Sequence, residues 1–263
     1  MDVELSMTLI AKYIFRIKKI YGADLLSCGY NLKNVSSEFY SDTINITKDN
    51  DYLHYMMRYQ MIIRSIYPTY NLSIPQISQY SYFSYENKNL LIKTKKTKIA
   101  ICTKGSMYYR VLDKNYIKEL ISKINRKYNN VSFLFIGSDK EEADKIEQIK
   151  NEFSDMDIIN LCAKTTLNEL IYLTKNIHLL ISVDTGVVHI AAANKTPSIV
   201  LYGSSAPEHS LGINHNLIAI YKKQNCSPCN KKQFVDKIKC KNPICLKSIS
   251  IDEIFINIKK ILN

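Results

Sequence analysis

Residues 179–203, which read LLISVDTGVVHIAAANKTPSIVLYG, decide the fold of this chain. An apolar run ends at Val183, the triplet Asp184-Thr-Gly follows, and small and apolar residues lead to a second apolar run behind Pro197. Apolar runs of about four to eight residues between turn residues are typical of strands that are buried on both faces. The stretch therefore predicts a strand, a loop, a short helix and a second strand.

The same alternation of strands and helices runs back to residue 97. Short apolar runs predict strands at 98–102, 131–136, 157–161, 177–183 and 197–202. Apolar residues at helical spacing predict helices that begin at Asp113, at residue 139, at the capping box of Thr166 and at residue 187. Strands that alternate with helices form a parallel sheet with helices on both faces, so the predicted fold class is α/β.

The two ends of the chain follow less regular patterns. Apolar spacing favours helices over 5–20 and 51–67 and a strand at 24–28. Residues 68–98 have no clear period and carry two prolines, so we place a domain junction there and predict domains over 1–94 and 95–263. Behind Gly203 we expect a polar loop, a cysteine cluster at 226–245 and a final helix that begins with a capping box at Ser250.

The composition is that of a soluble globular protein, with 46% apolar and 23% charged residues. No uncharged apolar run reaches the length of about 18 residues that a membrane span needs. Lysines interrupt the apolar stretch at 5–20, so it does not resemble the apolar region of a signal peptide. We therefore expect a cytoplasmic protein.

The chain carries 36 Lys and Arg against 24 Asp and Glu, a net charge of +12. A basic surface favours anionic partners such as nucleic acid, acidic lipid or a phosphorylated substrate, and it would allow peripheral contact with an anionic inner membrane. Richness in Lys, Ile, Asn and Tyr is also what an A+T-rich genome encodes. The 19 tyrosines are not interleaved with Lys and Arg on one element, so we expect no nucleic-acid partner.

The triplet Asp184-Thr185-Gly186 lies between the predicted central strand and its helix. Ligands of open α/β sheets bind at this edge, and a helix N-terminus offers N–H groups and a positive partial charge to a phosphate. Gly186 would let a ligand approach the backbone, and His189 in the first turn could donate to a phosphate oxygen. The alternatives are that Asp184 caps the helix, that Gly186 eases a turn and that His189 is a buried structural residue.

The loops behind the other predicted strands carry polar residues that should gather at the same edge. Candidate donor-binding residues are Thr103, Ser106 and Arg110 behind the first strand, Glu141 behind the second, and Thr165 and Thr166 behind the third. Hydroxyls and a cation suit phosphates, and an acid suits ribose hydroxyls, so the set predicts a nucleotide diphosphate site. Each has an alternative: a solvated Arg110, a Thr166 that only caps its helix and a Glu141 that pairs with a residue of its own helix.

The stretch at 179–203 resembles glycosyltransferase family 9, the bacterial lipopolysaccharide heptosyltransferase family. The shared pattern is an apolar strand, Asp-Thr-Gly, a His three residues later, a helix of small residues and a Pro-led strand that ends in Gly. The order of the Gly137–Glu141 and Thr165-Thr-Leu segments is also similar, and so is the cysteine-bearing tail. The resemblance covers residues 98–263 and, more loosely, 1–67.

The resemblance implies a GT-B-like fold, in which two Rossmann-like domains face each other and the C-terminal one binds a nucleotide-sugar, typically ADP-heptose. Asp184, Thr185, Gly186 and His189 would hold the diphosphate and sugar, Arg110 would contact the diphosphate, and Glu141 would contact the ribose. Thr165 and Thr166 would lie near the base. Such enzymes transfer the sugar with inversion to a glycolipid or glycoprotein acceptor such as the lipopolysaccharide core, and no cofactor is expected for the transfer.

The N-terminal part departs from the family pattern. Family members begin with a strand, a Gly-Asp loop and a helix in the acceptor domain, which supplies the catalytic carboxylate. Residues 1–5 resemble a later strand of that domain, so we expect a truncated acceptor domain and assign no catalytic residue. Two hypotheses follow: a glycosyltransferase, or a catalytically incomplete paralogue or fragment that binds a nucleotide-sugar or a partner subunit without turnover.

Four cysteines lie close together near the C-terminus: Cys226, Cys229, Cys240 and Cys245, with the spacing C-x2-C-x10-C-x4-C. Two close pairs of thiolates suit a tetrahedral zinc or iron site. The alternatives are reduced thiols in a loop or a redox-sensitive pair. The cluster, together with the basic charge, also raises a third hypothesis, a metal-ribbon protein that binds nucleic acid. We disfavour it because the cysteines flank a ligand-type α/β domain.

Overall fold

The computed structural model describes residues 95–211, 216–229, 240 and 242–262, with residues 63, 64 and 66–69 and the backbone of residues 21–24 and 42–45. The chain divides into two compact units, and each is described by itself. In the first, β1 (Tyr21–Asp24) pairs in parallel with β2 (Asp42–Asn45). The predicted helix at 5–20, most of that at 51–67 and residues 25–28 of a predicted strand lie outside the described residues.

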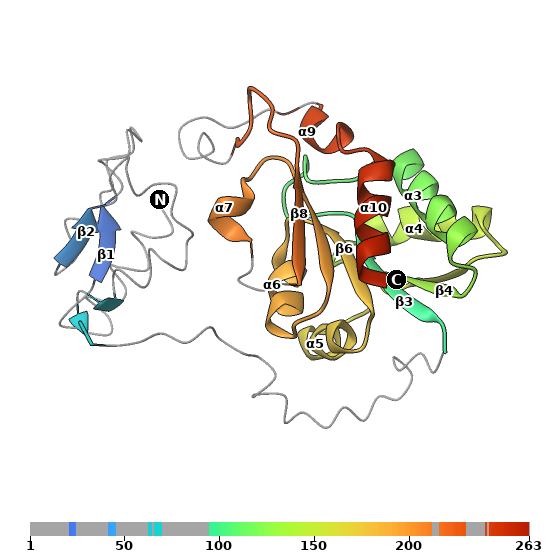
Figure 1. Ribbon diagram of the computed structural model, residues 1–263, viewed down its shortest axis with the longest axis horizontal. Helices are drawn as coiled ribbons and strands as arrows, with labels where there is room; N and C mark the ends of the chain where they lie inside the picture. The colour runs from blue at the N-terminus through green and yellow to red at the C-terminus, as the bar shows by residue number, and fades with distance from the viewer. Residues whose placement is uncertain are drawn as a thin grey trace. The chain divides into compact units, whose positions relative to one another are not determined.

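The second unit is built on a six-stranded sheet in the order β5-β4-β3-β6-β7-β8 (Figure 1). All five neighbouring pairs are parallel. The strands are β3 (Thr97–Cys102), β4 (Val131–Phe135), β5 (Asp157–Asn160), β6 (Leu179–Val183), β7 (Ser198–Tyr202) and β8 (Leu217–Tyr221). The order is that of a dinucleotide-binding Rossmann sheet. The predicted α/β class with a parallel sheet is therefore confirmed.

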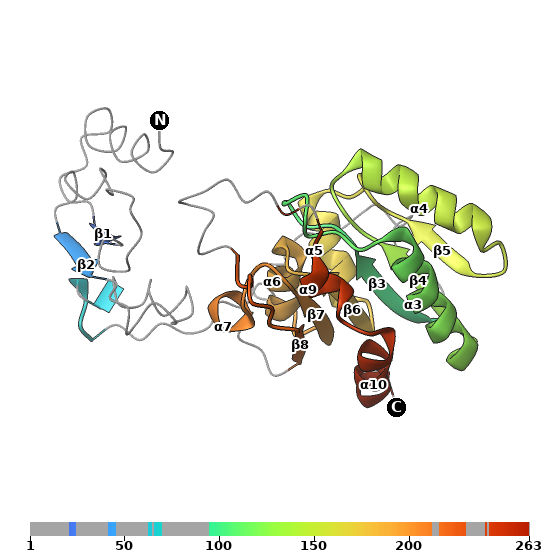
Figure 2. The same ribbon diagram turned by 90° about the horizontal axis from the view of Figure 1, so that it is seen from above.

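Helices cover both faces of this sheet (Figure 2). Alternate residues of β3 enter two different cores: Ile99 and Ile101 pack on one face, and Ala100 and Cys102 on the other. The first face holds α3 (Lys114–Lys127), α4 (Lys140–Glu152) and α10 (Ile251–Leu262). The second holds α5 (Leu167–Lys175) and α6 (Gly186–Ala193). The short helix α9 (Ile244–Lys247) also belongs to this unit, whereas residues 208–210 of the short helix α7 (Pro207–Ser210) belong to the first.

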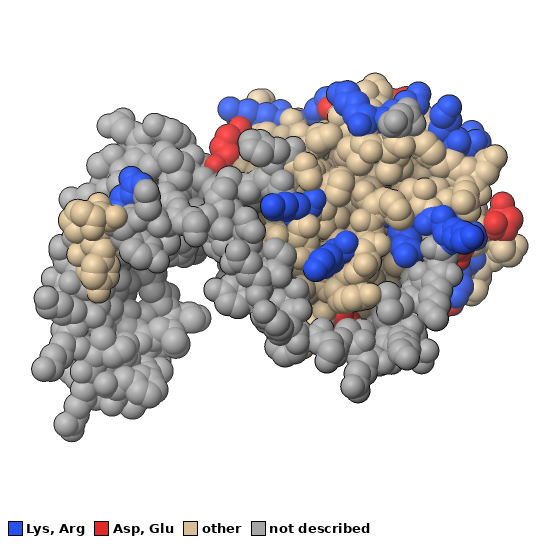
Figure 3. Space-filling view, turned by 60° about the horizontal axis from the view of Figure 1, so that its bottom comes forward, with Lys and Arg blue, Asp and Glu red and all other residues tan. Residues whose placement is uncertain are grey.

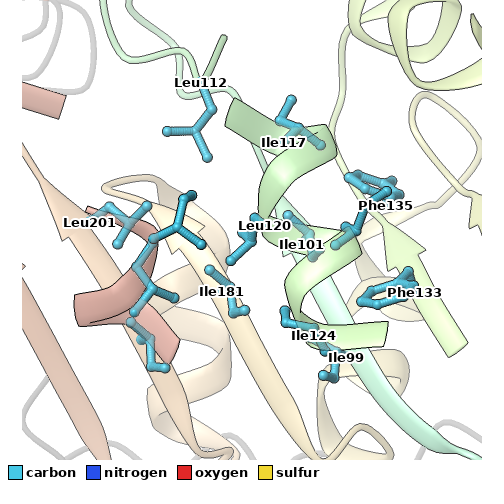
Figure 4. Packing of buried hydrophobic residues seen from close by; sticks show 14 of the residues in the cluster. Ile99, Ile101, Leu112, Ile117, Leu120, Ile124, Phe133, Phe135, Ile181 and Leu201 are labelled. Carbon is cyan, nitrogen blue, oxygen red and sulfur yellow. The ribbon is translucent and has the colours of Figure 1, made fainter. Parts of the chain in front are cut away.

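The larger core lies between the sheet and α3. Figure 4 shows Ile117, Leu120 and Ile124 of α3 facing side chains of β3 and β4, among them Phe133 and Phe135. These residues are fully buried, and burying each such side chain stabilises the fold by about 1.5–3 kcal/mol. The apolar residues at helical spacing in α3 therefore form the face of this helix that packs against the sheet.

Four of the helices begin where the sequence predicts. The side chain of Asp113 accepts a hydrogen bond at the start of α3, and that of Asp139 does so for α4. Thr166 and Glu169 form the reciprocal capping box of α5. For α10, the hydroxyl of Ser250 accepts from the N–H of Glu253 at 3.2 Å. Such caps satisfy N–H groups that the first helical turn leaves without partners.

Two of the described strands, β2 and β8, are missing from the sequence-based prediction. Residues 217–221, predicted as part of a polar loop, form β8 beside β7, so that prediction is wrong. The run LIAIY at 217–221 is apolar throughout, which is the sequence pattern that is typical of a strand. Because β8 is an edge strand, only Ile220 of its five residues is fully buried. Among the helices that the structure describes, none has the length and apolar character to cross a bilayer.

The topology creates one position for a ligand. The connection after β3 runs to β4 on one side, and that after β6 runs to β7 on the other, although β3 and β6 are neighbours. The loops behind these two strands therefore separate and leave a crevice at the carboxyl edge of the sheet.

Candidate functional site

A pocket of about 510 Å³ opens at this carboxyl edge. Its lining comes from the loops behind β3, β4, β5 and β6 and from the starts of α4, α5 and α6. The lining residues that carry polar side chains are Cys102, Lys104, Ser106, Ser138, Asp139, Glu142, Thr165, Thr166 and Thr185. Its size falls within the range of about 300–1,000 Å³ that is typical of small-molecule sites.

The N-terminus of α6 opens into this pocket. Thr185 is the N-cap residue, and no side chain makes a cap hydrogen bond there, in contrast to α3, α4 and α5. Gly186 lines the pocket, and a Cβ atom added to it would meet nothing within 4 Å. The first turn of α6 is therefore accessible to an anion, which the N–H groups and the helix dipole would favour.

Asp184 is not the cap of α6, so that alternative is wrong. Its side chain is 7% exposed, and its Oδ2 lies 3.2 Å from Nη1 of Arg110. The hydroxyl of Ser205 donates to the same oxygen. Arg110 also donates through Nε to Ser204 at 2.9 Å and through Nη1 to the carbonyl of Asp184 at 3.3 Å. Arg110 is therefore a partly buried link between three loops of the carboxyl edge and not a solvated cation.

The loop behind β3 is held tightly under the pocket. Gly105 donates to the carbonyl of Arg110 at 2.7 Å, and Lys104 forms a β-bridge with Val111. A Cβ at Gly105 would lie 3.1 Å from both the Cβ of Arg110 and the carbonyl of Asp184. A side chain at this position would force a neighbouring atom to shift by a few tenths of an ångström, so glycine suits the close approach of this loop to Asp184.

The ammonium of Lys104 joins the β3 loop to the start of α4. It lies 2.9 Å from Asp139 and 3.2 Å from Glu141. The hydrogen bond to Asp139 raises the pKa of Lys104 and lowers that of the Asp139 carboxyl. The side chain of Glu141 is 88% exposed and is not among the pocket lining. The sequence-based site did not include Lys104 or Asp139, although both stand in the loops from which the candidates were chosen.

Glu142, the residue after Glu141, does line the pocket. It is 3% exposed, and its Oε2 lies 2.7 Å from Nζ of Lys145. Burial raises the pKa of its carboxyl, and the neighbouring Lys145 offsets part of this effect. Sequence reasoning missed Glu142 because two adjacent acids at the start of a helix give no sign of which one faces inward.

Some of the remaining site residues that the sequence predicts line the pocket, and others do not. Ser106, Thr165, Thr166 and Thr185 line it, together with an apolar wall of Leu167, Leu170, Val187 and Ile190. Thr103 is 1% exposed, outside the lining, and its carbonyl accepts from the N–H of Leu112 at 2.9 Å. His189 is exposed on α6 and is also outside the lining, so the alternative of a buried histidine is wrong.

Cys226 is exposed, Cys229 and Cys245 are buried, and Cys240 is intermediate. Burial raises the pKa of the Cys245 thiol, and the nearby Cys240 and Cys226 add to this. Among the residues that the structure describes, no three His, Cys, Asp or Glu side chains lie close enough together to hold a metal ion. The predicted metal site remains a prediction, which metal analysis of the purified protein would test.

A Rossmann-type sheet with a helix N-terminus that opens into a pocket beside its switch point places the chain among the α/β proteins whose architecture suits phosphate-bearing ligands. The sequence profile of glycosyltransferase family 9 (heptosyltransferase) matches residues 16–239. Because this match covers most of the chain, the chain belongs to that family.

Two individual relatives are also named as heptosyltransferases. Lipooligosaccharide heptosyltransferase 2 of Haemophilus influenzae is 38% identical over 76 residues, 28% of this chain and 22% of the relative. Lipopolysaccharide core heptosyltransferase OpsX of the same organism is 27% identical over 140 residues, 51% of this chain and 40% of the relative. The alignments thus span less than half the length of these two proteins.

Among solved structures, ADP-heptose LPS heptosyltransferase II of E. coli is similar to this chain with a TM-score of 0.64 at 15% identity. The match covers 99% of this chain and 80% of that one. At this identity the likeness shows a shared fold, and it confirms the GT-B-like fold class that the sequence resemblance implied.

Proposed function

We propose that this chain binds a nucleotide-diphosphate sugar with the diphosphate at the N-terminus of α6. The observation that carries the proposal is the uncapped first turn of α6, with the open space in front of Gly186, at the edge of a pocket of about 510 Å³. A diphosphate placed there would accept from backbone N–H groups that no side chain caps.

The rest of the pocket supports a nucleotide as the ligand. The apolar side chains of Leu167, Leu170, Val187 and Ile190, which line the pocket, offer a weakly polar surface to a base. Hydroxyls of Ser106, Thr165 and Thr185 line the space between this wall and the α6 terminus. Arg110 is not among the lining residues, and its charge is offset by the ion pair with Asp184, so its role is to hold the loop at the end of β6 in place.

We further propose that the chain transfers a heptose from ADP-heptose, with inversion, to a lipopolysaccharide core or a related glycolipid or glycoprotein acceptor. Membership of the heptosyltransferase family supports this activity. The names of the relatives support the donor and the acceptor, since they act on lipooligosaccharide or lipopolysaccharide and one is an ADP-heptose enzyme. We assign no general base to a residue of this chain.

An acceptor of this kind would place the protein at the inner face of the cytoplasmic membrane. The net charge of +12 favours contact with anionic lipid. Figure 3 shows a face of the α/β unit on which the charged side chains are mainly Lys and Arg. Sedimentation with vesicles that contain anionic lipid, at low and high salt, would test this contact, because salt screens surface charges.

The proposal is tested by the thermal stability of the protein with ADP-heptose, ADP and a UDP-sugar. A ligand at about 100 times its Kd adds about 2.7 kcal/mol of stability, so ADP-heptose should raise the Tm by several degrees. Gly186→Val should fold normally, because the space in front of Gly186 is open and its φ lies outside the left-handed region, but its side chain would occupy the phosphate position.

Ala193→Val, at the last residue of the same helix, is the matched control and should respond to ligand as the wild type does. Absence of stabilisation by every nucleotide-diphosphate sugar, or an equal response of Gly186→Val, would refute the donor site. Release of ADP on addition of a lipopolysaccharide core acceptor would then separate a working transferase from a protein that only binds.

A further inference from the structure

The loop that follows β3 carries an exposed aromatic side chain close to the pocket. Tyr108 is 59% exposed, and a single exposed apolar residue is ordinary unless its position gives it a role. Among the described residues of the α/β unit, the exposed large apolar side chains are Tyr108, Leu167, Ile244 and Ile256. Leu167 lines the pocket, and so does Ser106, two positions before Tyr108. Because two residues span at most about 7 Å, Tyr108 stands near the rim of the pocket.

The turn that contains Tyr108 is held in a fixed position. The N–H of Arg110 donates to the carbonyl of Met107 at 2.8 Å, which closes the turn around Tyr108. The ring of Tyr109 is 4% exposed and packs edge-on against that of Tyr108, with centroids 5.0 Å apart and planes at 78°. The Arg110 guanidinium joins this turn to Asp184 at the end of β6. A side chain that is held in place before a ligand binds loses little conformational entropy on binding.

The chemistry of an aromatic ring shows which kind of ligand fits Tyr108. The face of the ring is apolar and carries a negative electrostatic potential. A phosphate or a carboxylate would be repelled by this face. One face of a pyranose ring presents mainly C–H groups, whose hydrogens carry a weak positive charge, so a sugar can stack on the aromatic face while its hydroxyls stay in water. Tyr108 therefore suits a sugar ring.

We propose that Tyr108 binds the acceptor by stacking on a sugar ring of its glycan beside the pocket. This inference rests on the proposed function of sugar transfer. In such a transfer an acceptor hydroxyl must reach the anomeric carbon of the donor sugar, so the acceptor ring lies at the mouth of the donor pocket. Tyr108 is not among the residues that line this pocket, which favours contact with the acceptor over contact with the donor.

The test is calorimetric titration of the full chain, saturated with ADP, with the core oligosaccharide that remains after lipopolysaccharide is stripped of its lipid. Tyr108→Ala should lower the affinity for this oligosaccharide by about 10-fold, the contribution of one aromatic contact. Tyr108→Phe should stay within about twofold of the wild type, because stacking needs the ring and not the hydroxyl. Ile256→Ala, which shortens an exposed apolar side chain of α10, is the matched control and should bind as the wild type does.

A second measurement locates the contact. The chain contains no tryptophan, so one indole introduced at a chosen position reports on that position alone. In Tyr108→Trp the oligosaccharide should shift the indole emission to shorter wavelength, because a stacked sugar removes water from the ring. Ile256→Trp should show no shift. An equal response of both variants, or a response of Tyr108→Trp to ADP with none to the oligosaccharide, would overturn the proposed contact.

The outcomes also separate this inference from the proposed function. Binding of ADP by the wild type, with no binding of the oligosaccharide or with equal binding by Tyr108→Ala, would overturn the role of Tyr108 and leave the donor site intact. Weaker binding of ADP-heptose alone in Tyr108→Ala would place the ring against the donor and overturn the inference as well. Failure of ADP and ADP-heptose to bind the wild type would refute the donor site, and this inference with it.

Discussion

The ion pair between Arg110 and Asp184 should stabilise the protein. We therefore expect substitutions at these two positions to have non-additive effects on the free energy of unfolding. Asp184→Ala would leave the Arg110 guanidinium, whose side chain is 18% exposed, without its carboxylate. Removal of one partner of a fully buried pair costs about 3–5 kcal/mol. Because Ser204 and the carbonyl of Asp184 still accept from Arg110, we expect the lower cost of about 2–3 kcal/mol.

Arg110→Met should cost about 3 kcal/mol, since the Asp184 carboxylate is more deeply buried and, among the residues that the structure describes, would keep the hydroxyl of Ser205 as its side-chain partner. The double variant contains neither charge, so its cost should resemble that of one single variant and not the sum. The coupling free energy should therefore be about 2 kcal/mol, well above the ~0.5 kcal/mol seen between independent sites.

Urea unfolding of the wild type, the two single variants and the double variant measures this coupling, since urea does not screen charges. Each single substitution should also lower the Tm by roughly 5–10 °C, at about 2–4 °C per kcal/mol for a domain of this size. A coupling free energy below about 0.5 kcal/mol would show that the two side chains do not interact, and the link between the three loops would be refuted.

Gly203→Ala should destabilise the protein by about 1–3 kcal/mol in urea unfolding, because its Cβ would lie 2.8 Å from Sγ of Cys245 and 3.0 Å from Cγ of Leu246; an unchanged midpoint would mean that α9 moves without cost. Thr166→Ala should cost about 1 kcal/mol by the same measurement through loss of the α5 capping box, and Thr166→Ser should restore it. Burial raises the pKa of Cys102 to about 11 and of Cys162 to about 12, so peptide mapping after iodoacetamide treatment should find both unmodified in the native protein and the exposed Cys226 modified. Alkylation of Cys102 or Cys162 before unfolding would contradict their burial.

The strands of the α/β unit were predictable because each is an apolar run set between helical repeats. Burial on both faces demands such runs in a parallel sheet, and the observed β3 to β7 agree with the predicted ranges to within two residues. The helix starts at Asp113, Asp139 and Thr166 were predictable for a local reason, since a cap involves only residues within one turn. The edge strand β8 was missed, although its apolar run was present in the sequence.

The sequence by itself determined that Asp184-Thr185-Gly186 stands at the carboxyl edge of a parallel sheet, because the apolar run before it and the small residues after it specify a strand and a helix. Only the tertiary structure decided what each side chain does there. Asp184 turns away from the helix that it precedes and binds Arg110, a residue 74 positions earlier in the chain. Glu142 faces the pocket while Glu141 faces solvent, because successive helix positions point in different directions and only packing against the sheet selects the inward one.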